Sequence, residues 1–384
     1  MYRKAEYRIL LESINNGSEK IKFVTGPRQV GKTTVVNQVL ETLREQEVAV
    51  VYSSADMPAP GDSGWIENNW SSARRLAVHT KTVLVLDEIQ KILNWAEVVL
   101  YLKSEDKSGE HPFQVVLVDS SELNIPVNET ENYEILRIEH WSMREMHEAF
   151  GYTVNKYLVF GGFPGGAVLS GNYQKWRSYM LDSLIETSIS RDILMVNRVE
   201  KPIVLRNLFM YACKNPCDIV SYTKLLPELQ DAGNTTTVAG YLKLLQGAGL
   251  VAGVGKYGGD YERKRRSSPK LLPLDTSLVC AVCGVSPDTI ANSPEWENRL
   301  FRTAIGCSMY AKTGREGNAE LMYWKAGNLE VDFVYRTDHS VYGFDICLDA
   351  ERCKRKGIGL FKKQYPHART VLLGGAEMPL DQAL

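Results

Sequence analysis

The chain has 384 residues, 44% of them hydrophobic and 24% charged, and its formal net charge is −1. This length predicts two or three domains, and the balanced charge excludes a global basic field, so any surface for nucleic acid must be local. The sequence has no apolar run long enough to span a bilayer, its charged N-terminus is unlike a signal peptide, and its seven cysteines do not form a disulfide framework. These features predict a cytoplasmic protein with no membrane partner.

Residues 1–20 predict a short amphipathic helix, and a phosphate-binding loop follows it. The segment 21–34 reads IKFVTGPRQVGKTT, and a helix-compatible stretch comes next. This is the strand, loop and helix order that such a loop requires. Glycines let successive N–H groups point at an anion, the lysine can reach the β- and γ-phosphates of ATP, and a threonine hydroxyl can bind Mg²⁺. The candidate nucleotide-binding residues are Gly26, Pro27, Arg28, Gln29, Val30, Gly31, Lys32, Thr33 and Thr34, with Thr33 also a ligand of Mg²⁺.

Three further apolar runs predict buried strands, at 48–52, 82–86 and 115–118. Strands of this kind that alternate with helices indicate a parallel sheet covered on both faces. Asp87 and Glu88 follow the third strand directly, at the edge where open α/β sheets bind ligands. We expect Asp87 to hold Mg²⁺ through water and Glu88 to orient or deprotonate the attacking water, although two solvated acids are the alternative. Ser120, after the fourth strand, is the predicted sensor of the γ-phosphate, and a plain turn explains it nearly as well.

GPRQVGKT followed by LDEIQK resembles a family of prokaryotic ATPases that have an AAA-type N-terminal domain and a C-terminal domain of unknown function labelled DUF4143. Further matching motifs span nearly the whole chain: GGFP at 161–164, the segment 185–193, SPK at 268–270, DTSL at 275–278, WEN at 296–298 and EVDF at 330–333. The resemblance implies an α/β architecture: a P-loop AAA-type parallel-sheet domain, a winged-helix domain and a C-terminal restriction-endonuclease-like domain. The expected bounds are 1–155 for the ATPase domain, 156–204 for a helical lid or linker, 205–285 for the winged helix and 286–384 for the nuclease-like domain.

One departure from the family pattern concerns hydrolysis. Family members usually carry a Gly-Arg pair shortly after the fourth strand, and residues 131–132 here are Glu-Asn. A cation on the transition-state oxygens can change the rate by about 10³ or more. Arg191 is the candidate replacement, with Arg137 and Arg144 behind it. An ion pair with Asp192 explains Arg191 equally well.

Residues 221–226 and 238–246 predict two helices, and a strand begins at 250–251, an order that resembles a winged helix. The loop 263–270 holds the basic side chains Arg263, Lys264, Arg265, Arg266 and Lys270. A basic run beside a recognition helix suits the phosphates of double-stranded DNA. A protein contact or a solvated basic loop is the alternative.

Three acids in the last hundred residues resemble the metal site of the restriction-endonuclease fold: Glu297 on a helical stretch, Asp332 in a strand and Asp345 in the next strand. That chemistry also needs a lysine to position or activate water. Cys347 stands at the lysine position, and a thiol with a pKa of about 8.5 is mostly neutral at pH 7. Losing such a group costs a factor of about 10²–10³, so we expect a degenerate and inactive nuclease site. Coincidence among exposed carboxylates is the alternative.

Three functions follow from these patterns. The first is a Mg²⁺-dependent ATPase that couples ATP binding or turnover to a winged-helix and nuclease-like module acting on DNA. The second is an ATP-dependent binding or assembly switch with negligible hydrolysis, and the third is an ATP-gated, metal-dependent nuclease. The expected partners are ATP or ADP, double-stranded DNA and further copies of the chain in a homo-oligomer.

Overall fold

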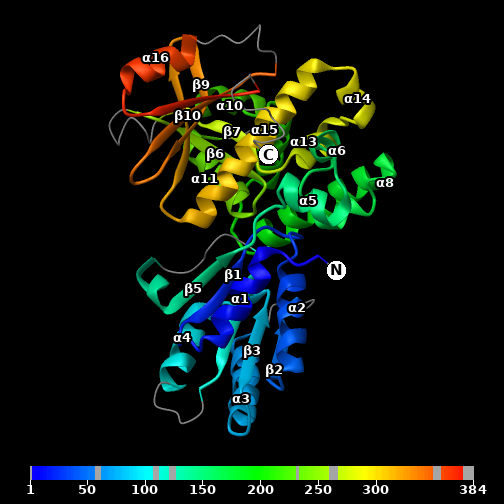
Figure 1. Ribbon diagram of the computed structural model, residues 1–384, viewed down its shortest axis with the longest axis vertical. Helices are drawn as coiled ribbons and strands as arrows, with labels where there is room; N and C mark the ends of the chain where they lie inside the picture. The colour runs from blue at the N-terminus through cyan, green and yellow to red at the C-terminus, as the bar shows by residue number, and fades with distance from the viewer. Residues whose placement is uncertain are drawn as a thin grey trace. The chain divides into compact units, whose positions relative to one another are not determined.

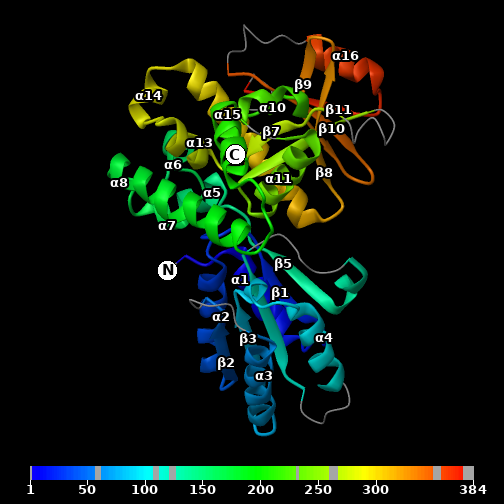
Figure 2. The same cartoon turned by 180° about the vertical axis from the view of Figure 1, so that it is seen from behind.

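The computed structural model describes residues 2–56, 62–106, 112–120, 127–230, 233–258, 267–348 and 356–374. The chain divides into two compact units, Met1–Glu139 and His140–Leu384. Figures 1 and 2 show each unit built around its own sheet.

A five-stranded sheet forms the centre of the N-terminal unit, with the strand order β2-β3-β4-β1-β5. Its strands are β1 (Ile21–Thr25), β2 (Ala49–Ser54), β3 (Thr82–Asp87), β4 (Gln114–Asp119) and β5 (Tyr133–Arg137). All neighbouring strands pair in parallel, which confirms the predicted α/β class and its parallel sheet. The carboxyl ends of β1, β3 and β4 therefore meet at one edge of the sheet, and the candidate residues lie there.

Helices cover the two faces of this sheet (Figure 1). They are α1 (Ala5–Asn15), α2 (Lys32–Glu45), α3 (Ser63–Ala77) and α4 (Trp95–Asp106), with the short turns η1 (Ile89–Lys91) and η2 (Val127–Asn132). Alternate side chains of a strand point to opposite faces, so Phe23 of β1 packs into one core with Trp70 of α3 and Trp95 of α4. The rings of Phe23 and Trp95 stack with their centroids 5.6 Å apart. This packing fixes the strand from which the phosphate loop emerges.

The C-terminal unit contains a six-stranded sheet with the order β11-β10-β9-β8-β6-β7. Its strands are β6 (Val251–Lys256), β7 (Lys270–Pro273), β8 (Glu320–Ala326), β9 (Leu329–Arg336), β10 (Val341–Ile346) and β11 (Arg369–Leu373). The antiparallel pair β6–β7 joins the antiparallel strands β8, β9 and β10 through a parallel contact between β6 and β8. One sheet thus runs across the boundary expected near residue 285.

Most of the helices of this unit precede or connect those strands. They are α5 (Met143–Phe150), α6 (Val154–Phe160), α7 (Pro164–Ala167), α8 (Tyr173–Ser178), η3 (Tyr179–Ile185), η4 (Ser188–Leu194), α9 (Pro202–Lys214), α10 (Tyr222–Glu228), α11 (Thr235–Gly247), α13 (Thr276–Cys283), α14 (Pro287–Ala291), α15 (Pro294–Glu316) and α16 (Lys356–Gln364). The helices α10 and α11 and the pair β6–β7 contain the segments for which a winged helix is predicted.

Two of the sequence motifs, GGFP and DTSL, meet in the interior of this unit. The Asp275 carboxylate accepts a hydrogen bond from the Gly162 amide at 2.8 Å and another from the Ser277 amide at 2.8 Å. The Gly162 carbonyl accepts a bond from the Trp141 amide at 2.9 Å. A Cβ atom on Gly162 would lie 2.2 Å from the Trp141 carbonyl oxygen, so only glycine fits there. These two motifs therefore serve packing within the C-terminal unit.

Gly162→Ala is expected to destabilise the protein, because the new methyl group must displace the Trp141 backbone. Overpacking of this kind lowers the free energy of unfolding by about 1–3 kcal/mol or more. Urea denaturation followed by circular dichroism measures the change. Gly171→Ala is the matched control, since nothing lies within 4 Å of its added Cβ. Equal midpoints for the two variants would contradict the assignment.

Candidate functional site

The loop 26–31 makes a tight turn between β1 and α2, and both of its glycines have backbone conformations that favour glycine. Gly26 has φ +149°, and a Cβ there would lie 2.0 Å from the Ile138 carbonyl oxygen. Gly31 has φ +97° and forms the N-cap of α2. The loop thus ends at a helix N-terminus, where amide groups and the helix dipole favour an anion.

The Lys32 side chain lies across this loop and is buried, with 5% of it exposed. Its Nζ atom donates hydrogen bonds to the carbonyl oxygens of Gly26 at 2.9 Å and Pro27 at 2.7 Å. Phosphate oxygens are stronger acceptors for an ammonium group than neutral carbonyls, because both partners are then charged. The lysine is therefore held in place to transfer these bonds to an anion in the loop.

Thr33 and Asp87 lie side by side where the loop faces the end of β3. The Thr33 hydroxyl donates to Asp87 Oδ2 at 3.0 Å, and the Tyr52 hydroxyl donates to the same oxygen at 2.8 Å. The Glu88 amide donates to Asp87 Oδ1 at 2.9 Å. Burial raises the pKa of Asp87, and the bonds from Tyr52 and Thr33 oppose that rise. A hydroxyl and a carboxylate in contact are the hard oxygen donors that Mg²⁺ prefers, so this pair fits the ion.

Glu88 is held by neighbours on two sides. The Ser120 hydroxyl donates to Oε1 at 2.7 Å, and the Gln90 amide donates to Oε2 at 2.7 Å. Burial raises the pKa of Glu88, but the bond from Ser120 and the positive charges of Lys91 and Lys32 outweigh it, and the pKa is lowered. The carboxylate is thus an anion at neutral pH, as a group that accepts a proton from water must be.

The three candidate arginines lie in different places. Arg137 pairs with Thr25 in the β1–β5 ladder, immediately before the loop in that register. Arg191 lies exposed in η4, and Arg144 lies exposed on α5 with an ion pair to Glu148 at 2.9 Å. Of these arginines, Arg137 alone belongs to the unit that contains the phosphate loop.

The acids of the predicted nuclease site are only partly brought together. Asp345 on β10 lies beside Asp332 on β9; burial, followed by the negative charge of Asp332 and a hydrogen bond to it, raises the pKa of Asp345 to about 7. Glu297 lies on the first turn of α15. Among the residues that the structure describes, no three carboxylate, histidine or cysteine side chains form a group that could hold a metal ion.

Two basic side chains, Lys270 and Arg302, lie next to Asp332 of this pair. Lys270 is 1% exposed, and its Nζ contacts Glu330 Oε1 at 2.7 Å, the Asp332 carbonyl oxygen at 2.8 Å and Asp332 Oδ1 at 3.8 Å. Arg302 Nη1 lies 3.5 Å from the same Oδ1 atom. The sequence predicted Lys270 in a DNA-binding loop. Instead its ammonium group lies in the protein interior, where Glu330 and Asp332 neutralise its charge.

Cys347 does not carry the free thiol that the sequence suggested, since it is disulfide-bonded. The side chain therefore supplies neither a cation nor a titrating thiol at the position where the resemblance to the restriction-endonuclease fold predicts a lysine. The basic residues 263–266 of the predicted loop lie outside the described residues.

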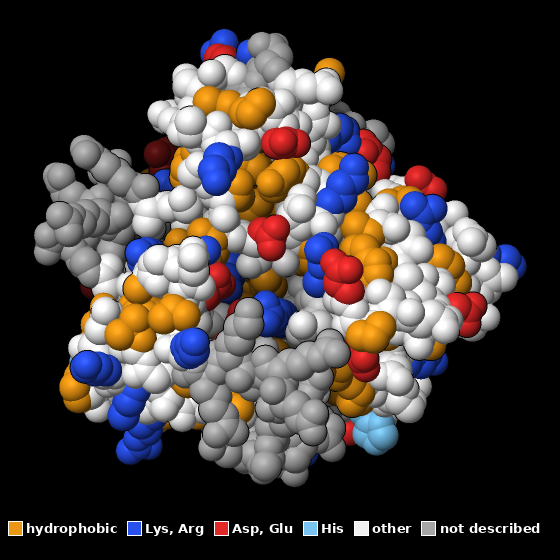
Figure 3. All heavy atoms as spheres, turned by 90° about the horizontal axis from the view of Figure 1, so that it is seen from above, with side chains coloured by type: hydrophobic (Ala, Val, Ile, Leu, Met, Phe, Trp, Pro, Cys, Tyr) orange, Lys and Arg blue, Asp and Glu red, His pale blue; other side chains and the backbone are white. Residues whose placement is uncertain are grey.

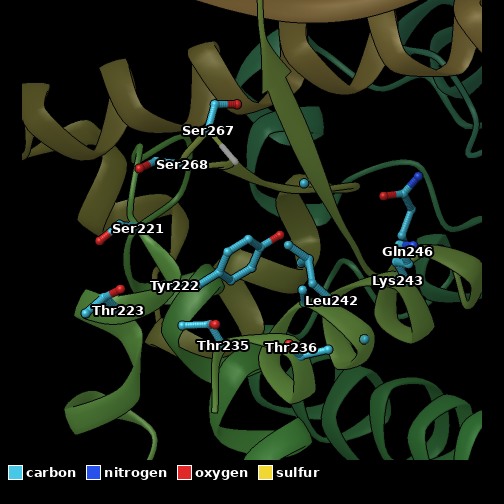
Figure 4. Close-up of a pocket in the computed structure, with 13 residues that line it drawn as sticks. Ser221, Tyr222, Thr223, Thr235, Thr236, Leu242, Lys243, Gln246, Ser267 and Ser268 are labelled. Atoms are coloured by element: carbon cyan, nitrogen blue, oxygen red, sulfur yellow. The ribbon is translucent and has the colours of Figure 1, made fainter. Parts of the chain in front are cut away.

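A groove of about 840 Å³ lies beside α11 (Figure 4). Its walls come from the start of α10, one face of α11, the strand β6 and the segment before β7: Ser221, Tyr222, Thr223, Thr235, Thr236, Ala239, Gly240, Leu242, Lys243, Gln246, Gly253, Ser267 and Ser268. Most of these side chains are hydroxyls or amides, Lys243 is a cation, and none is a carboxylate. On the face seen in Figure 3, basic and acidic side chains are interspersed among the described residues.

Family comparison matches two separate parts of the chain. Residues 18–147 match the model of the AAA domain. Nearly all of the N-terminal unit therefore matches the AAA domain. Residues 152–289 match a model described as a domain of unknown function, DUF8612, where the motifs of the sequence had suggested DUF4143. The AAA domain coincides with the parallel sheet and with the loop, acids and serine described above.

No curated protein matches the chain. Solved structures that resemble it include Orc1 of Aeropyrum pernix in complex with DNA, with 13% identity, 76% of this chain and 94% of that chain covered, and a TM-score of 0.34. A RuvB structure from Thermotoga maritima has 18% identity, 65% and 87% coverage and a TM-score of 0.34. AMPPCP-bound DnaA from Aquifex aeolicus has 15% identity, 64% and 89% coverage and a TM-score of 0.33. Within the described part of the chain, no helix has both the length and the apolar character to cross a bilayer.

Proposed function

We propose that the AAA domain binds ATP with Mg²⁺ and hydrolyses it, and that the state of the nucleotide controls the C-terminal unit. The observation that carries this proposal is the contact of the Thr33 hydroxyl with Asp87 Oδ2 at 3.0 Å, beside a glycine loop crossed by Lys32. In this proposal the loop amides and Lys32 bind the phosphates, and Thr33 and Asp87 hold Mg²⁺. The bound ion would neutralise phosphate charge.

Glu88 then orients or deprotonates the attacking water. Ser120 fixes the Glu88 carboxylate through its 2.7 Å bond and lies at the end of β4, where the γ-phosphate is expected. Arg191 is proposed as the cation for the transition state. Since no Gly-Arg pair occurs at 131–132, a switch with negligible hydrolysis is the second form of the same proposal.

Calorimetry with ATP and ADP, in Mg²⁺ and in EDTA, tests the binding step. A phosphate-release assay with and without DNA then separates the ATPase from the switch. Turnover that Arg191→Ala abolishes supports the ATPase. Tight binding without measurable turnover supports the switch, and a folded protein that binds neither nucleotide contradicts both.

The groove beside α11 supports a second proposal, that a winged helix in the C-terminal unit binds double-stranded DNA. Hydroxyls and amides donate hydrogen bonds to phosphate oxygens, and Lys243 adds a charge-assisted contact. Ala239 and Gly240 carry at most a methyl group, so a nucleic-acid backbone can approach this face of α11 closely. Among the described residues that line the groove none is a carboxylate, so these side chains do not repel a phosphate backbone.

Lys243→Ala is expected to weaken binding to a labelled duplex, because one phosphate contact is lost. We expect a several-fold loss and a salt dependence whose slope falls by about 1. Fluorescence anisotropy over a salt series measures both quantities. Lys312→Ala on α15 is the matched control, since it removes an exposed lysine outside the groove. Equal effects of the two variants would exclude the groove, and a duplex that never binds would favour a protein contact.

We propose that the nuclease-like part is inactive. Lys270 and Arg302 face the anions Glu330 and Asp332, while the raised pKa of Asp345 keeps a proton on that carboxyl up to about pH 7. A divalent cation would have to compete with two protein cations for these carboxylates. Intact plasmid after incubation with Mg²⁺ or Mn²⁺ and ATP is the expected result, and cleavage would establish the third function instead.

A further inference from the structure

Tyr52 is a side chain of the nucleotide site that the sequence patterns did not single out. It lies on β2, the edge strand next to β3, and pairs in register with Val85. Its hydroxyl reaches two residues further along β3 and donates to Asp87 Oδ2 at 2.8 Å. The residue is 38% exposed, so its ring is partly open to solvent while its hydroxyl is anchored to the carboxylate.

Two donors hold the Asp87 carboxylate from opposite ends. The Glu88 amide binds Oδ1 at 2.9 Å, and the Tyr52 hydroxyl binds Oδ2. The third donor, Thr33, must turn its oxygen toward the metal ion if it becomes a ligand, and its hydrogen bond to Asp87 then weakens or is lost. After that change Tyr52 is the side chain that still fixes Oδ2.

We infer that Tyr52 is a positioning residue that orients Asp87 for Mg²⁺. This inference rests on the proposed function of the AAA domain. A phenol suits the role because it donates a hydrogen bond without carrying a charge. A lysine or arginine at the same place would cancel the negative charge that attracts the metal ion, whereas the tyrosine leaves it available.

The inference differs from a purely structural role in which Tyr52 only ties β2 to β3. Loss of a strand contact lowers stability and affects all ligands of the domain alike. Loss of the orienting bond changes the dependence on Mg²⁺ and leaves the affinity for metal-free nucleotide unchanged. The ratio of the two affinities therefore distinguishes the roles, even for a variant that is partly unfolded.

The experiment measures binding of a fluorescent ATP analogue to the full chain during a Mg²⁺ titration, and again in EDTA. In Tyr52→Phe the Mg²⁺ concentration at half-maximal effect should rise by roughly 10-fold, the effect of one hydrogen bond to a charged group. Tyr101→Phe is the matched control, because the Tyr101 hydroxyl also donates to a carboxylate, Glu105 Oε1 at 2.9 Å, on α4 of the same unit. That variant should titrate like the wild type.

Half-maximal Mg²⁺ concentrations that agree between Tyr52→Phe and the wild type would overturn the inference and leave the proposed function standing. A parallel loss of affinity in Mg²⁺ and in EDTA would likewise assign Tyr52 a structural role. Failure of the wild type to bind the analogue under any condition would overturn the proposed function, and the inference with it.

Discussion

Lys32→Ala is expected to abolish measurable ATP binding. The Lys32 ammonium group already lies over the loop, where its Nζ atom makes two hydrogen bonds to the carbonyls of Gly26 and Pro27. In the complex we expect these bonds to pass to phosphate oxygens. Each hydrogen bond to a charged group contributes about 1.5–3 kcal/mol, so losing two weakens binding by roughly 10²-fold or more. Isothermal titration calorimetry of the purified variant measures the change.

The control for this variant is Lys20→Ala, which removes an exposed lysine just before β1. It should bind ATP like the wild type. Thermal denaturation of both variants establishes that they are folded at the temperature of the titration. Unchanged affinity in Lys32→Ala would refute the assignment of the loop.

Glu88→Gln is expected to stop turnover while ATP stays bound. The amide keeps the size of the side chain but cannot accept a proton from water, and removing a general base costs a factor of about 10²–10⁴ in rate. Binding should survive, because the Glu88 side chain is held by hydrogen bonds from Ser120 and Gln90, and the substitution leaves Lys32 and the loop glycines unchanged. A phosphate-release assay gives the rate, and analysis of nucleotide retained after gel filtration gives the occupancy.

Glu97→Gln, an exposed position on α4, serves as the control for turnover. Two results would contradict the expectation for Glu88→Gln. If Glu88→Gln releases phosphate as fast as the wild type, another group must activate the water. If the wild type itself shows no turnover but retains ATP, the switch is the correct form of the proposal.

The sequence predicted the centre of the AAA domain because its signals are local. The strands β1 to β4 are short apolar runs between turns, and the loop chemistry needs only the spacing of glycines and a lysine. The edge strand β5 was missed: it is five residues long, and only Tyr133 in it is buried, so it shows neither an apolar run nor a clean alternation.

Contacts between distant segments could not be read from the chain. The Tyr52 bond to Asp87 joins positions 35 apart in the sequence, and the Lys270 bond to Asp332 joins positions 62 apart. Each depends on which strands become neighbours in a sheet. Lys270 therefore looked like part of a basic loop, although the fold encloses it among acids. Cys347 is a similar case, since nothing local distinguishes a free thiol from a bonded one.

The two-residue contact between β6 and β8, at Gly255 and Lys256, has a practical consequence for anyone who divides this protein. A fragment that stops before β8, or one that begins after β7, would present a bare row of amide and carbonyl groups along the cut. Such a margin recruits strands from other molecules, and the fragments would form aggregates. The part of the chain that follows the AAA domain should therefore be expressed as one undivided fragment.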